Sequence, residues 1–179
     1  SAYFCPACGH NSVTQTFSDT LRKIKAKKDG IDVVRKALIE SIGKDEAELT
    51  CRSLRETCIS DGIVAFQKYC EGMYEDFGKI PFNAFQRLEQ GSQLWIIAVQ
   101  KGYNDWISDE ELKKLNILYQ KRHLLSHNEG IVDSQYINKS GDTAYKEGQR
   151  IVIIDKDIDS LVSSLEKLSN GIKSVCSNI

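Results

Sequence analysis

Residues 45–77 read DEAELTCRSLRETCISDGIVAFQKYCEGMYEDF, and this stretch decides the fold class. Apolar side chains recur in it at intervals of three and four, the spacing of one buried helix face. This stripe comprises Leu54, Cys58, Val64 or Ala65, Phe66, Tyr69, Cys70 and Met73. Because cysteine packs in a helix core as a small hydrophobe, Cys51, Cys58 and Cys70 are expected to be buried free thiols. The pattern predicts a long amphipathic helix.

Further helices are predicted on both sides of this segment. Residues 17–43 have helical spacing with a charged break at Lys27-Lys28-Asp29-Gly30. Downstream, the turn at residues 78–81 precedes a predicted helix that begins at Phe82 or Asn83 and ends at Val99. Another helix is predicted from Ser108, an N-cap completed by Glu111, to about His127, with Gly130 in the turn that follows.

The residues after position 131 change in character. Tyr136-Ile137 and residues 150–154, RIVII, favour β structure and are separated by glycine-containing turns, which predicts a small hairpin. Asp155 is expected to cap a final helix with an apolar stripe from Ile158 to Ile172. The expected fold is therefore mainly α, a helical bundle with a small β-hairpin before the C-terminal helix.

Composition limits the functional classes. The chain has 179 residues, 41% hydrophobic and 27% charged, which is typical of a globular domain rather than a disordered one. A net charge of −1 gives no overall attraction to nucleic acid, so a polyanion would need a local basic patch. The longest apolar run, residues 94–99, is far shorter than the roughly 18 residues of a membrane span. No secretory signal is evident, and a cytoplasmic protein with reduced thiols and no membrane partner is expected.

The most informative segment for chemistry is RHLLSH, residues 122–127. Arginine presents a permanently charged fork suited to phosphate, and histidine exchanges protons near neutral pH. On an ideal helix, however, Arg122 and His127 lie about 140° apart. They would converge only if the helix distorted near its end or if a two-fold dimer formed a joint cleft.

Three structural alternatives compete with catalysis at this segment. Arg122 could cap carbonyl groups at the end of the helix, and a protonated His127 is favoured there by the helix dipole. His123 and His127, four residues apart, share one helix face and could bind a metal ion. No acidic or cysteine ligand accompanies them in the sequence, so the metal alternative has little support.

In its wider context this segment resembles the HEPN superfamily, whose hallmark is an arginine, four to six residues and a histidine near a helix end. The context is GIVD at residues 130–133, Tyr136-Ile137, Gly141-Asp142 and GQR at residues 148–150, as in a bacterial HEPN-like group with an N-terminal zinc-ribbon-like piece. The likeness covers most of residues 45–175, and residues 17–179 are expected to form the HEPN-like domain.

The resemblance implies a metal-independent endoribonuclease that acts as a homodimer in phage defence or a toxin–antitoxin system, with RNA and a partner protein or antitoxin as binding partners. Arg122 would bind the scissile phosphate, His127 would act in acid–base chemistry, and His123 and Asn128 would be secondary contacts. Other HEPN domains are inactive dimerisation or interaction modules, so that alternative stays open. No cofactor is expected for catalysis.

A separate unit is predicted at residues 1–16. Cys5-Pro-Ala-Cys8 followed by Gly9 has the spacing of one zinc-ribbon knuckle, because two thiolates separated by two residues can reach one tetrahedral ion. A complete site needs four ligands, and the second knuckle is missing from this sequence. Cys5 and Cys8 are therefore predicted as a half-site whose partner pair lies upstream and which holds structural zinc in a longer chain. The alternative is a relic knuckle that binds no metal. A zinc-dependent nucleic-acid-binding protein is a third, weaker hypothesis.

Overall fold

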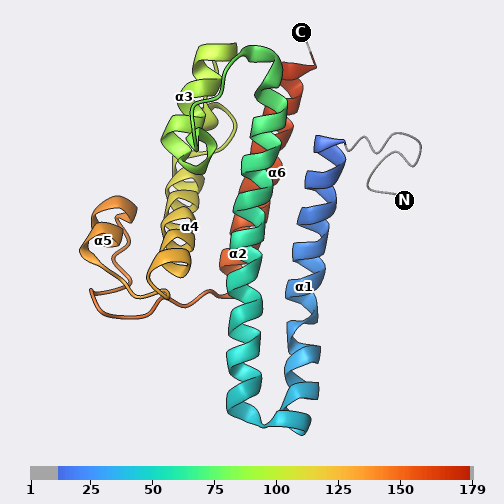
Figure 1. The fold of residues 1–179 in the computed structure, drawn as a ribbon, viewed down its shortest axis with the longest axis vertical. Coiled ribbons are helices and arrows are strands. Elements are labelled where there is room, and N and C mark those ends of the chain that lie inside the picture. The colour runs from blue at the N-terminus through green and yellow to red at the C-terminus, as the bar shows by residue number, and fades with distance from the viewer. Residues whose placement is uncertain (1–11, 178–179) are drawn as a thin grey trace.

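The structure of the protein is a computed structural model, and it describes residues 12–177. Two long antiparallel helices, α1 (Val13–Ile42) and α2 (Lys44–Tyr74), lie side by side (Figure 1). They are joined by Gly43, whose φ of 91° is easily adopted only by glycine. The predicted break at residues 27–30 is wrong, because α1 continues through it. Lys27 pairs with Asp61 at 2.9 Å and Lys28 pairs with Asp159 at 2.5 Å, so the charges of this run are matched by acidic groups of other segments and do not interrupt the helix.

The core is one cluster of buried side chains around α2, drawn from α1, from residues 85–124 and from the C-terminal helix α6 (Asp155–Cys176). Figure 1 shows α2 in the middle of these elements. The predicted stripe of α2 is largely confirmed, since Cys58, Phe66, Tyr69 and Cys70 are all buried. Cys51, Cys58 and Cys70 are buried free thiols, as expected. The fold is therefore a mainly α helical bundle, in agreement with the sequence.

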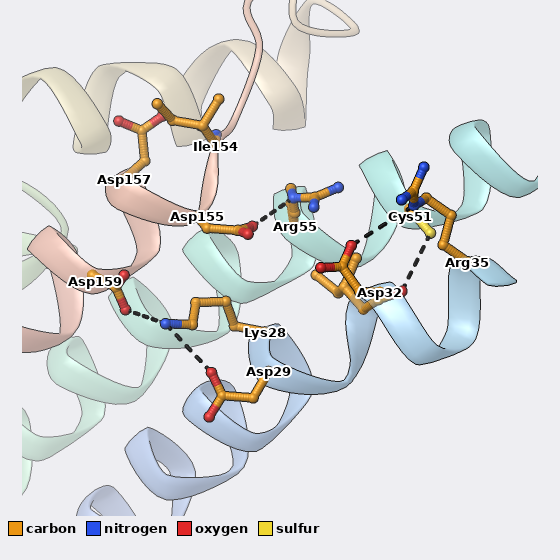
Figure 2. A network of polar contacts seen from close by, with 11 residues as sticks. Lys28, Asp29, Asp32, Arg35, Cys51, Arg55, Ile154, Asp155, Asp157 and Asp159 are labelled. Atoms are coloured by element: carbon orange, nitrogen blue, oxygen red, sulfur yellow. Dashed lines mark hydrogen bonds and ion pairs between the residues drawn. The ribbon is translucent and has the colours of Figure 1, made fainter.

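Ion pairs fix the start of α6 against the hairpin of α1 and α2 (Figure 2). Arg55 of α2 pairs with Asp155 at 2.7 Å, and Lys28 of α1 pairs with Asp159. The hydrogen bond to Asp159 raises the pKa of Lys28. Because the carboxylates of Asp155 and Asp159 are at least half exposed, these pairs orient α6 more than they stabilise it.

The remaining helices lie on the side of α2 away from α1, as Figure 1 shows. Short 3₁₀ turns, Glu75–Phe77 and Ala84–Gln86, lead into α3 (Leu88–Val99), and a third, Tyr103–Asp105, precedes α4 (Asp109–His127). The helix predicted from Phe82 or Asn83 is thus divided at Arg87, whose backbone is extended. Both ends of α4 are confirmed, since Ser108 and Glu111 form the predicted capping box and Gly130, at φ 77°, follows the helix.

The predicted β-hairpin is wrong. Tyr136 and Ile137 belong to α5 (Ser134–Ser140), where the Asp133 side chain accepts the backbone N–H of Tyr136 at 2.7 Å. Between residues 12 and 177 there is no β-strand, and residues 150–154 contribute a single bridge, Arg150 to Ile131. Burial still alternates along this extended segment, since Ile151 and Ile153 are buried while Val152 and Ile154 are exposed.

The start of the C-terminal helix differs from the sequence prediction. Helix α6 begins at Asp155 rather than being capped by it, and the backbone N–H of Ile154 donates to Asp157 at 3.2 Å.

Within residues 12–177 no helix combines the length and apolar character needed to cross a bilayer. Cys5 and Cys8, the predicted zinc half-site, lie outside the described residues.

Candidate functional site

The C-terminal end of α4 is held by a compact turn. The backbone N–H groups of Asn128 and Gly130 both donate to the carbonyl oxygen of Leu124, at 2.8 and 3.0 Å. The Asn128 side chain donates to the carbonyl oxygen of Ile131 at 2.7 Å. Asn128, predicted as a secondary active-site residue, therefore lies in the turn and orders the chain directly after His127.

A cavity of ≈ 520 Å³ lies beside this end of α4. Its walls come from α4, from residues 83–89, from α5 and from Ile63 of α2. Arg122, His123 and His127 all line it. Because several elements surround α4 here, the cavity extends around the helix and reaches side chains that an ideal helix directs about 140° apart. One chain therefore brings the three predicted residues to one cavity.

Arg122 is unusual among the arginines of the described chain. Its Nε is buried and has no hydrogen-bond partner among residues 12–177, and the same holds for the hydroxyl of Tyr119, which lines the same cavity. By contrast, Arg150 pairs with Glu56 at 2.7 Å. Among residues 12–177 the Arg122 side chain donates to no helix carbonyl, so the capping alternative gains no support. The cavity is bordered by two buried polar groups that lack an acceptor.

The two histidines of the segment lie against each other. The ring centroids of His123 and His127 are 4.7 Å apart, with 49° between the ring planes. Burial lowers the pKa of His123 below its ordinary 6.5, and the charges of His127, Lys139 and Arg122 lower it further, against an opposing effect of Asp133. The His123 ring is therefore neutral near pH 7 and able to accept a proton or a hydrogen bond.

The cavity has a local excess of positive charge. Arg87, Arg122 and Lys139 line it, and Glu89 is the one acidic side chain among its lining residues. This excess contrasts with the net charge of −1 for the whole chain. A local basic patch is what the composition required of any site that binds a polyanion.

The metal alternative gains no support from the described residues. Among residues 12–177 no group of three or more His, Cys, Asp or Glu side chains is arranged to hold a metal ion. His123 and His127 accordingly have no third ligand there. The zinc prediction for Cys5 and Cys8 is untouched by this observation and stays a prediction.

The sequence interpretation did not identify several residues that line the cavity. Tyr119 and Gln120 precede His123 by one turn and share its helix face, so the spacing alone could have identified them. Arg87 and Lys139 belong to α3's N-cap and to α5. No local pattern links those two positions to residue 122, because only the packing of three elements brings them together.

Fold and cavity define the class of this protein as a mainly α helical bundle with a basic cavity at the end of α4. Comparisons with protein-family models, curated proteins and solved structures found no match to the chain. The function is therefore inferred from the geometry and charge of the cavity.

Proposed function

We propose that the protein is a metal-independent endoribonuclease of the HEPN type, which cleaves RNA by attack of its 2′-hydroxyl. The observation that carries the proposal is that Arg122, without an acidic partner among the described residues, shares one cavity with His123 and His127. Unsatisfied donors of Arg122 and Tyr119 need acceptor oxygens, and a phosphodiester supplies them. The excess of basic side chains favours the same ligand.

The reaction needs only proton transfer and charge stabilisation. The 2′-oxygen forms a bond to phosphorus while the bond from phosphorus to the 5′-oxygen breaks, so the products are a 2′,3′-cyclic phosphate and a 5′-hydroxyl. A base takes the proton of the 2′-hydroxyl, and an acid supplies one to the departing 5′-oxygen. The guanidinium of Arg122 would hold the non-bridging oxygens and stabilise their added negative charge.

The histidine pair suits the proton transfers. Protonation of one ring disfavours protonation of the other, because the ring centroids are only 4.7 Å apart. The lowered pKa of His123 keeps that ring neutral beside His127 near neutral pH. His127 would exchange the proton with RNA, and His123 would be the neutral secondary contact.

The test is cleavage of single-stranded RNA by the purified protein in the presence of a chelator. His127→Ala and Arg122→Met should each lower the rate by about 10²-fold or more. Arg52→Met on α2, away from the cavity, is the matched control and should retain activity. The 3′ ends should carry cyclic phosphate. Equal cleavage by the wild type and the His127→Ala variant would sink the assignment.

Loss of folding is separable from loss of chemistry in this experiment. Arg122 has no hydrogen-bond or ion-pair partner among residues 12–177, so Arg122→Met removes no stabilising contact and should leave the melting temperature unchanged or raised. A large fall in melting temperature would instead support a structural role for the guanidinium.

A second candidate function is a non-catalytic dimerisation or interaction module. It is favoured by exposed apolar side chains near the joined ends of α1 and α2, where Ile42 and Leu49 are 51% and 46% exposed. A second copy of the chain is the proposed partner for this surface. Under this candidate, sedimentation shows a dimer, and neither the wild type nor any variant cleaves RNA.

A further inference from the structure

We propose that the same cavity binds the nucleobase next to the scissile phosphate and that Gln120 recognises the edge of this base. This inference rests on the proposed ribonuclease function and adds a specificity-determining residue to it. The inference rests on polar side chains of the cavity that take no part in the proposed acid–base chemistry.

The cavity is rich in side-chain amides, contributed by Asn83, Gln86, Asn116, Gln120 and Gln135. Three of them are already bonded within the protein. Gln86 donates to the side chain of Asn83 at 3.1 Å, and Asn116 donates to the carbonyl oxygen of Lys139 at 2.9 Å. The side-chain amides of Gln120 and Gln135 form no hydrogen bond within residues 12–177. Of these two, Gln120 is on α4, the helix that carries the arginine and both histidines.

Helix geometry places Gln120 within reach of a bound nucleotide. Gln120 lies one turn before His123 and two turns before His127, which is about 4.5 Å and about 10.5 Å along the helix axis. All three line the cavity. A phosphate held by Arg122 near the histidines would therefore place its adjacent base along the helix toward Gln120.

The chemistry of this part of the cavity matches a nucleobase. A glutamine amide offers a donor and an acceptor side by side, and this pair complements the polar edge of a base. Ile63 and Leu88 supply apolar wall against which the face of a base can pack. The volume of ≈ 520 Å³ falls in the range of small-ligand sites.

Recognition of this kind requires an unpaired base. In A-form duplex RNA the Watson–Crick edges are paired, the major groove is too deep and narrow for side chains to read, and the shallow minor groove is recognised mostly by its shape. Unstacked bases of single strands expose both edges and faces. The cavity is therefore expected to accept single-stranded RNA and to discriminate among its bases.

The test is binding, measured by fluorescence anisotropy, of 2′-O-methyl tetranucleotides of adenine, cytosine or uracil, which cannot be cleaved. The dissociation constants of the wild type should differ by about 5-fold to about 150-fold between the best and the worst base, the discrimination of one good bidentate contact. Gln120→Leu should remove this difference. Gln93→Leu, an exposed glutamine of α3 outside the cavity, should keep it.

Equal affinity of the wild type for all three oligonucleotides would overturn the inference, and so would an unchanged preference in Gln120→Leu. Tighter binding of a duplex than of single strands would overturn it as well. Because binding needs no cleavage, the two proposals fail separately. A base preference that depends on Gln120 in a protein that does not cut RNA would reject the ribonuclease and leave base recognition standing.

Discussion

The Nε atom of Arg122 is buried and has no hydrogen-bond partner among the described residues. Other arginines are paired, since Arg55 contacts Asp155 and Arg150 contacts Glu56, both at 2.7 Å. Leaving a buried donor unsatisfied costs about 1–3 kcal/mol. Departures from local optimisation of this kind concentrate at functional sites, where the group is reserved for a ligand. This reasoning makes Arg122 the centre of the proposed site.

The electrostatic coupling within the site predicts the titration of His123. Its pKa should lie below 6.5 in the folded protein, measured from its imidazole NMR signals against pH, and His127→Asn should raise that pKa. Lys101→Gln, whose charge is not among those acting on His123, should leave it unchanged. A His123 pKa above 6.5 in the wild type would contradict the arrangement.

The same shift sets the sign of a stability change. Because folding lowers the pKa of His123, the unfolded chain binds a proton more readily. The free energy of unfolding is therefore unaffected by this group above about pH 6.5 and declines as the pH falls from there through the lowered pKa.

At the scale of elements, α4 is the scaffold of the site, because it carries Arg122, His123 and His127 near its C-terminal end. Its N-terminus is fixed by the capping box of Ser108 and Glu111. Hydrogen bonds from Lys167 of α6 and from Ser108 lower the pKa of Glu111 to about 2. The cap thus joins α4 both to its own first turn and to α6.

Removing the cap should destabilise the protein measurably. Ser108→Ala should lower the free energy of unfolding by about 1 kcal/mol, since the backbone N–H of Glu111 loses its acceptor. The change can be measured by urea unfolding. Ser163→Ala, an exposed position inside α6, is the control and should show no loss. Equal stability of Ser108→Ala and the wild type would refute the role of the cap.

At the scale of the whole molecule, packing decides what a glycine does. A Cβ atom at Gly171 of α6 would lie 2.3 Å from Cγ of Trp106, so α6 can approach that ring only with glycine there. At Gly30, in the middle of α1, a Cβ atom would meet nothing within 4 Å. Both glycines lie within helices, but only Gly171 is packed against another side chain.

Alanine substitutions at these two glycines should therefore have opposite effects. Gly30→Ala should raise the free energy of unfolding by about 0.8–1 kcal/mol, the difference in helix propensity. Gly171→Ala should lower it by about 1–3 kcal/mol, because overpacking against Trp106 outweighs the propensity gain. Thermal unfolding of both variants would measure the difference. Stabilisation by Gly171→Ala would show that the approach of α6 to Trp106 is looser than described.

Sequence patterns correctly predicted the elements that depend on residues close together in the chain. The apolar stripe of α2 and the capping box of α4 depend on residues within one or two turns, and both are present. The hairpin failed for the complementary reason. Residues 148–151 bond to residues 130–132 rather than to Tyr136, as in the 2.8 Å bond from the N–H of Val132 to the carbonyl oxygen of Gln149. β pairing depends on a distant partner that periodicity does not identify.

The sequence by itself determined a mainly helical chain and the presence of an arginine and two histidines at one helix end, because helix formation and capping are governed by near neighbours. The tertiary structure alone decided that Arg122 and His127 share a cavity, that Arg87 and Lys139 make it basic and that Gln120 lies beside them unbonded. These properties arise from the packing of α4 against α5 and the 83–89 segment, and contacts between distant segments leave no periodic trace in the chain.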